Sequence, residues 1–144
     1  RLYILEPEAR LQTTADVMSA LHSLIQTAQG NQAPLVSAEV DPRVMPTLAE
    51  EHARNLLQIV REAISNAQRH AKAQSIRVEL KQLDGHPRLT ISDDGCGFEA
   101  RAPSSGGHGL LNMAARAKLM GAHLEILSKL GLGTQVAVDL PQSA

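Results

Sequence analysis

Aromatic residues are nearly absent from this chain of 144 residues, which contains one Tyr, one Phe and no Trp. Without stacking platforms the protein is poorly suited to binding single-stranded nucleic acid. A net charge of −1 also argues against broad binding to nucleic acid or to anionic membranes, so any phosphate site must be local. The core must therefore be built from aliphatic side chains.

Cysteine and long apolar runs are also scarce. The single cysteine excludes a disulfide framework and suits a reducing cytoplasm. No run approaches the roughly twenty apolar residues of a membrane span, and no signal peptide opens the chain. We expect a cytoplasmic domain without membrane contact of its own. Because the chain begins at Arg1 rather than Met, an inner-membrane anchor in a longer protein stays open.

Aliphatic content, in contrast, is ample. A hydrophobic fraction of 43% over 144 residues predicts one compact domain. We place this domain at residues 11–144 and interpret residues 1–10 as the tail of an upstream region.

Hydrophobic periodicity predicts the order of the helices and strands. Spacings of three and four predict helices over 11–29, 48–71 and 110–120. Alternation predicts strands over 35–40, 75–83, 88–93, 123–128 and 134–140, the first of them at a sheet edge. Asp84-Gly85 is typical of a hairpin turn, and the Pro-, Ser- and Gly-rich segment 99–107 is predicted to be a mobile loop. Antiparallel pairs grouped in this way favour an α+β sandwich over a doubly wound parallel sheet.

A glycine-rich turn follows the predicted strand 88–93. Asp93 ends that strand as an acceptor of the kind that an adenine amino group needs, and Gly95 and Gly97 let the backbone turn sharply beside a ligand. The run from Gly95 to Ala100 also matches the dinucleotide pattern G-x-G-x-x-A. That pattern must open a helix, whereas a loop composition follows here. Taken alone, the turn fits a nucleotide site and a plain glycine turn equally well.

Polar side chains form a stripe on the longest predicted helix. Glu62 and Asn66 are one turn apart, and either Arg69 or His70 extends the stripe. The amide oxygen suits Mg²⁺, the carboxylate can orient or deprotonate a water, and the cation can meet phosphate. The plainer interpretation is a solvated helix face, which periodicity alone favours.

Two further glycine segments are candidates for phosphate contacts. Gly107-His108-Gly109 leads into the third predicted helix, whose first amides suit an anionic phosphate, although glycine capping explains the segment equally well. Gly133-Thr134 in the last hairpin could add a hydroxyl, but a glycine turn before a strand is the commoner reason for such a pair.

Taken in order, these segments resemble the catalytic ATP-binding domain of sensor histidine kinases, within the superfamily that includes gyrase, Hsp90 and MutL. The matching boxes are Glu62-x-x-x-Asn66-x-x-Arg69-His70-Ala71, Asp93-x-Gly95-x-Gly97, Gly107-x-Gly109-Leu110 and Gly131-Leu-Gly133-Thr134. The run His108-Gly-Leu-Leu-Asn-Met113-Ala-Ala-Arg116-Ala117 is similar to the nitrate-sensor and degradative-enzyme-sensor branch, which has a short ATP lid.

The resemblance implies a Bergerat ATP-binding fold. This is a two-layer α/β sandwich in which a mixed sheet of about five strands is covered on one face by three helices. It implies that Asp93 binds the adenine amino group, with Gly95 and Gly97 leaving space for the base. It further implies that Asn66 holds Mg²⁺ and that Glu62 assists phosphoryl transfer from ATP. The implied phosphate contacts come from Arg69, His70 and the amides of Gly107, His108, Gly109 and Leu110. Catalysis would then be positioning and charge neutralisation.

The resemblance also implies a protein histidine kinase. Its γ-phosphoryl acceptor would be a histidine on a dimerisation helix outside this chain, and a response regulator would receive the group next. No acceptor segment of the Leu-His-Asp kind is found here, and His22 is the nearest candidate. The alternative is an anti-sigma or partner-switch serine kinase, in which the same ATP pocket gates protein association. Intact Glu62, Asn66 and Asp93 argue against a degenerate relic.

Overall fold

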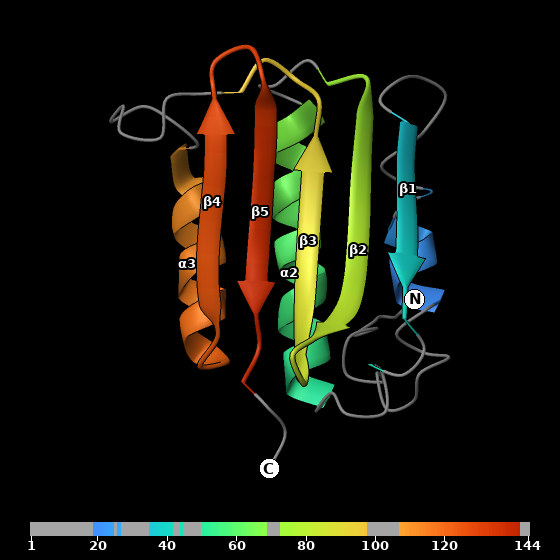
Figure 1. Ribbon diagram of the computed structural model, residues 1–144, viewed down its shortest axis with the longest axis vertical. Coiled ribbons are helices and arrows are strands. Elements are labelled where there is room, and N and C mark those ends of the chain that lie inside the picture. Colours follow the sequence, from blue (N-terminus) through green and yellow to red (C-terminus); the bar gives the residue numbers. More distant parts are fainter. Residues whose placement is uncertain are drawn as a thin grey trace, which may run out of the picture.

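The protein has one five-stranded sheet with the strand order β1-β2-β3-β5-β4 and helices on one of its faces (Figure 1). The computed structural model describes residues 19–24, 26, 35–41, 44, 50–68, 73–97 and 107–141. The elements are β1 (Leu35–Val40), α2 (Glu50–Asn66), β2 (Ser75–Leu83), β3 (His86–Asp93), α3 (Gly107–Leu119), β4 (His123–Lys129) and β5 (Gly133–Asp139). This arrangement confirms the predicted α+β sandwich.

The helix expected over 11–29 falls only partly within the described residues. Residues 19–24 and 26 are helical and lie on the same side of the sheet as α2 and α3 (Figure 1). Leu21 from this segment is buried in the common core. The expected upstream tail, residues 1–10, and the loop expected at 99–107 lie outside the described residues, apart from Gly107.

β1 is the strand that makes the sheet mixed. It pairs with β2 in parallel, whereas β2–β3, β3–β5 and β4–β5 are antiparallel. The chain passes through α2 between β1 and β2, and parallel neighbours require such a crossover. The predicted hairpins are thus confirmed, and β1 takes the edge position that its sequence predicts.

The core lies between the sheet and the helices. Inward side chains alternate along the central hairpin, where Ile76, Val78, Leu80, Leu89 and Ile91 are buried. Among the described residues, the buried hydrophobic side chains are all Ala, Val, Leu, Ile or Met. The sequence therefore builds this core without aromatic rings, as its composition requires.

Both helices bury one stripe of side chains. On α2 these are Ala53, Leu56, Ile59, Val60, Ala63 and Ile64. On α3, Met113 and Ala117 are buried, and Met120, directly after the helix, continues their spacing and is buried too. Gly121, with φ 66°, ends α3, and the amide of Ala122 donates to the carbonyl of Ala117 in the manner of a glycine C-cap.

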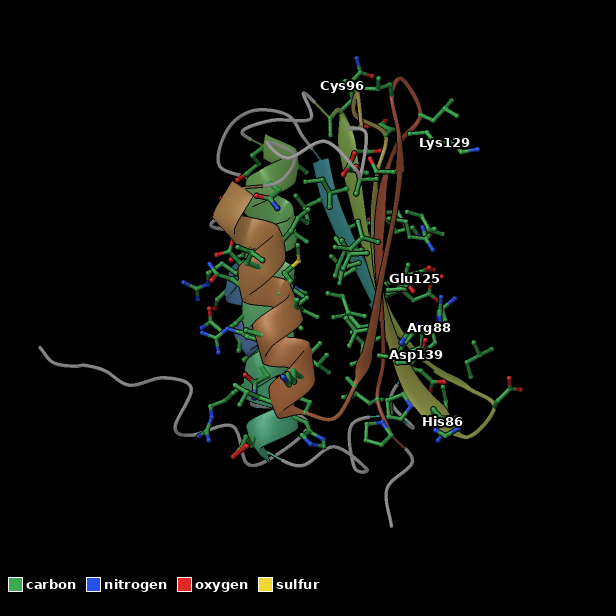
Figure 2. The ribbon with its side chains drawn as sticks, turned by 90° about the vertical axis from the view of Figure 1, so that its left-hand side faces the viewer. His86, Arg88, Cys96, Glu125, Lys129 and Asp139 are labelled. Carbon is green, nitrogen blue, oxygen red and sulfur yellow. The ribbon has the colours of Figure 1, made fainter. Side chains whose placement is uncertain are left out.

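The opposite face of the sheet is polar (Figure 2). Arg88 on β3 donates from Nη1 to both carboxylate oxygens of Asp139 on β5, at 2.8 and 2.7 Å. Arg77 joins Glu39 and Glu79 at 3.0 Å each. Within the described residues no helix covers this face.

One end of the molecule gathers the segments that carry the motifs. α2 and β3 run toward this end, and α3 and β5 start from it (Figure 1). The register pairs Asp93 on β3 with Thr134 on β5. The ends of α2 and β3 and the starts of α3 and β5 are therefore brought together by the topology. No helix in the described part of the chain is long and apolar enough to cross a membrane.

Candidate nucleotide site

Asp93 occupies the last position of β3, and its carboxylate is fixed by backbone amides. Oδ1 accepts a hydrogen bond from the amide of Gly95 at 2.8 Å, and the amide of Thr134 also donates to the carboxylate. Burial raises the pKa of the Asp93 carboxyl, the two amide bonds oppose this, and the charge of Asp94 adds to it. The structure thus places a rigid, partly desolvated oxygen acceptor where the sequence predicts one.

Asp94 has a structural role that the sequence reasoning missed. Its Oδ1 accepts the amides of Gln74 at 2.8 Å and Ser75 at 2.9 Å, and its Oδ2 lies 3.0 Å from the Ser75 hydroxyl. The hydrogen bonds from these backbone amides, that of Ser75 first, lower the pKa of the Asp94 carboxyl. These bonds tie the start of β2 to the turn after β3. An acidic residue in a glycine turn is the only local signal, because its partners lie 19 and 20 residues earlier.

Gly97 is packed against the β4–β5 turn. Its φ is 67°, and a Cβ on it would meet the carbonyl oxygen of Lys129 and lie 3.0 Å from that of Gly133. The amide of Gly131 donates to the carbonyl of Cys96, which joins the same two turns. Figure 2 shows Cys96 and Lys129 at the same end of the sheet. Backbone fills the side where a Cβ of Gly97 would lie, so this packing alone requires glycine here. That Gly97 also leaves space for the base stays a prediction.

Gly133 and Thr134 complete this packing from β5. Gly133 has φ 89°, and a Cβ on it would meet the carbonyl oxygen of Asp93. The Thr134 hydroxyl lies 2.7 Å from that of Ser128, whose Oγ also donates to the carbonyl of Gly133 at 3.3 Å. The hydroxyl therefore has a partner within its hairpin, and its contact with a phosphate stays a prediction.

Glu62 and Asn66 are half-buried at the end of α2 that points toward the site. The Oε1 of Glu62 accepts a hydrogen bond from Nδ2 of Asn112 on α3 at 3.4 Å. This exposed hydrogen bond connects Glu62 with α3, the helix whose first turn carries the predicted phosphate segment. After Asn66 the chain continues through a π-type turn at Ala67 and Gln68, a form frequent at functional sites.

The first turn of α3 is formed by the predicted phosphate segment. α3 begins at Gly107, before the expected start at Leu110, so Gly107, His108 and Gly109 are helical. The amides of a first helical turn lack intrahelical acceptors and can bind an anion. Leu110 is half-buried and packs on the core, which fixes this end of the helix.

Two predicted residues, Arg69 and His70, lie outside the described part of the chain. Their contacts with phosphate stay predictions. Within that part, no group of three or more His, Cys, Asp or Glu side chains could hold a metal ion. Any Mg²⁺ at Asn66 would therefore need further oxygen ligands from elsewhere.

Comparison with known proteins defines the class. Residues 51–144 match the family described as histidine kinase-, DNA gyrase B-, and HSP90-like ATPase. The match covers more than half of the chain, and the protein belongs to this family of ATPases. Membership supports ATP as the nucleotide that the domain uses.

Relatives within the family are bacterial sensors. The chain is 36% identical over 101 residues to the nitrate/nitrite sensor protein NarX of Escherichia coli K12, covering 69% of this chain and 17% of NarX. It is 38% identical over 92 residues to the sensor histidine kinase LiaS of Bacillus subtilis, covering 64% and 25%. For NarQ of Escherichia coli K12 the identity is 35% over 128 residues, covering 87% and 22%. The chain spans about a fifth of the length of these relatives.

Solved structures share the fold. The histidine kinase domain of the blue-light-activated kinase of Erythrobacter litoralis EL346 aligns with a TM-score of 0.72 at 24% identity, over 90% of this chain and 60% of that one. AdeS of Acinetobacter baumannii aligns with a TM-score of 0.64 at 15% identity, over 94% and 68%. These likenesses confirm the predicted fold class.

Proposed function

We propose that this chain is the ATP-binding catalytic domain of a two-component sensor histidine kinase. It transfers the γ-phosphoryl group of ATP to a histidine on a dimerisation helix outside the chain, and the group then passes to a response regulator. The observation that carries the proposal is the meeting of Asp93, the Glu62–Asn66 stripe and the first turn of α3 at one end of the sheet (Figure 1). The sensor relatives support this class of acceptor. Because the proposed reaction uses ATP and a response regulator, both of them cytoplasmic, the proposal puts this domain in the cytoplasm.

Asp93 recognises the adenine ring in this proposal. Its carboxylate is held by the amides of Gly95 and Thr134, so the remaining lone pairs have a fixed direction. The 6-amino group of adenine donates to such an acceptor. Guanine carries an oxygen at that position, and two acceptors face to face repel each other. The site is therefore selective for ATP over GTP.

The phosphates lie between α2 and the start of α3. Asn66 would hold Mg²⁺ through its amide oxygen, and the metal would supply positive charge beside the phosphates. Arg69, His70 and the amides of residues 107–110 bind the phosphate oxygens. Glu62, held by Asn112, orients the acceptor or takes its proton.

In the reaction, the bond between the γ-phosphorus and the bridging oxygen of ADP breaks while a bond forms to an imidazole nitrogen of the acceptor. The attacking nitrogen uses its lone pair, the other ring nitrogen gives up its proton to a base, for which Glu62 is the candidate, and ADP leaves with the electron pair of the broken bond. This chain contributes position, charge and that base, whereas the acceptor supplies the nucleophile.

Two measurements test the proposal. Titration with ATP and with GTP, each with and without Mg²⁺, should show binding of ATP that Mg²⁺ strengthens and little binding of GTP. Asn66→Leu, which keeps the size of the side chain and removes the oxygen ligand, should abolish the Mg²⁺-dependent part. Phosphorylation of a supplied dimerisation domain should give an acid-labile phosphohistidine. A flat ATP titration would contradict the nucleotide site, and an acid-stable phosphoserine would favour the partner-switch class of kinase.

A further inference from the structure

Arg116 and Asn55 form a polar bridge between α3 and α2, away from the candidate site. Nη1 of Arg116 donates to Oδ1 of Asn55 at 3.1 Å, and Nδ2 of Asn55 donates to the carbonyl oxygen of Glu51 at 3.1 Å. Asn55 is only 7% exposed and is the one buried polar side chain within the described ranges. An amide in an aliphatic core is costly unless both of its ends are satisfied, as they are here. Such a bridge adds a directional hydrogen bond to the apolar packing between the two helices.

A second bridge lies at the site end of the same two helices. Nδ2 of Asn112 donates to Oε1 of Glu62 at 3.4 Å. Asn112 and Arg116 are one turn apart on α3, while Glu62 and Asn55 are two turns apart on α2 and follow in the opposite order. The helices are therefore antiparallel, and the two bridges lie along one seam. The part-buried bridge between Arg116 and Asn55 is remote from the site, and the exposed bridge between Asn112 and Glu62 belongs to it.

We propose that Arg116 is a positioning residue for the phosphate half of the site. Its bond to Asn55 fixes where α3 lies along α2, and this sets the separation between the first turn of α3 and the Glu62–Asn66 stripe. The inference rests on the proposed function, in which both elements bind the same phosphates. Arg116 is about 14 Å along the helix axis from Gly107, so it acts on the phosphates only through the position of the helix.

The adenine half of the site does not depend on this bridge. Asp93 and its amide partners, Gly95 and Thr134, belong to the sheet and its turns. A shift of α3 along α2 leaves these bonds in place. Loss of the bridge therefore weakens binding of the phosphates and spares binding of the base.

The test compares the affinities of Mg·ATP and adenosine in matched variants, by calorimetry for the first and by NMR shifts for the second. Arg116→Met keeps the apolar stem and removes the donor. It should lower Mg·ATP affinity about tenfold and change adenosine affinity less than about twofold. Arg116→Lys should recover most of the loss, because its ammonium can still donate to Asn55. Asn55→Ala should give a similar loss, and the double variant should add nothing further.

Lys118→Ala is the control, because it removes a cation from the exposed face of the same helix. It should leave both affinities unchanged. Unchanged Mg·ATP affinity in Arg116→Met, equal losses for ATP and adenosine, or additive losses in the double variant would each overturn the positioning role. A wild-type chain that binds no Mg·ATP would overturn the proposed function as well. If the wild type binds Mg·ATP and Arg116→Met binds it with the same affinity, only this inference is overturned.

Discussion

Gly97 and Lys129 meet through their backbones, so closely that a β-carbon on the glycine would meet the lysine carbonyl oxygen. The glycine-rich turn after β3 is thus packed on the β4–β5 turn. The β4–β5 turn carries Leu130 and Leu132, both largely exposed, so its backbone rather than its side chains makes the contact. The spacing of glycines in these two motifs has a structural cause in addition to any contact with a nucleotide.

The contact predicts unequal costs for two glycine substitutions. Gly97 and Gly121 have φ values of 67° and 66°, but a β-carbon at Gly121 would have nothing within 4 Å. Gly121→Ala should therefore cost about 1–2 kcal/mol for its backbone conformation alone. Gly97→Ala adds a backbone clash and should cost about 3–4 kcal/mol of unfolding free energy. Urea unfolding of both variants measures the difference, and equal losses would contradict the packing contact.

Asp93→Asn should separate stability from recognition. Because burial raises the folded-state pKa of Asp93, ionisation costs more in the folded chain than in the unfolded one. The contribution of Asp93 to the free energy of unfolding is therefore largest below its ordinary pKa of 3.8. This contribution is lost as the pH rises through the higher pKa of the folded state. The variant should lack this loss, while ATP affinity at neutral pH should fall by about 1.5–3 kcal/mol. Urea unfolding at pH 4 and pH 7, with ATP titration, checks both. A larger pH-dependent loss in the variant would contradict the assignment.

Asp94→Asn should have the opposite pH signature. Its amide bonds with Ser75 and Gln74 lower the folded-state pKa, so its stabilisation is present above the ordinary value of 3.8 and is lost as the pH falls through the lowered one. The variant should be less stable than the wild type at pH 7, and the gap should close in acid. Thermal unfolding from pH 7 to pH 2.5 follows this gap. Asp84→Asn removes the same charge from an exposed turn and serves as the control.

Much of the fold could be predicted because one face of the sheet is buried. Alternation at Ile76, Val78 and Leu80 shows which side of β2 meets the helices. Periodicity predicts the start of α3 at Leu110, three residues late, because glycines are weak helix formers and Gly107 and Gly109 give no helical signal of their own. The parallel pairing of β1 depends on the crossover through α2, which periodicity does not encode.

The site could be predicted only where a residue's own position reveals its use. Asp93 ends an apolar strand, and Glu62 and Asn66 share a helical stripe, so local spacing marks these three as candidates, and their use in a nucleotide site stays a prediction. The partners of Asp94 and of Arg116 are brought close by sheet pairing and helix packing across long stretches of chain. No local sequence pattern encodes such pairs, because their members meet only in the folded chain.

Glu62→Gln should separate nucleotide binding from phosphoryl transfer. The substituted amide keeps its size and an oxygen that can still accept the hydrogen bond from Asn112, so α3 stays in place. Mg·ATP affinity should change by less than about twofold, whereas transfer to a supplied dimerisation domain should fall about 10²–10⁴-fold because the base is lost. Glu51→Gln makes the same chemical change at an exposed position near the other end of α2 and should leave both values intact. Transfer at the wild-type rate by Glu62→Gln would show that Glu62 takes no part in the chemistry.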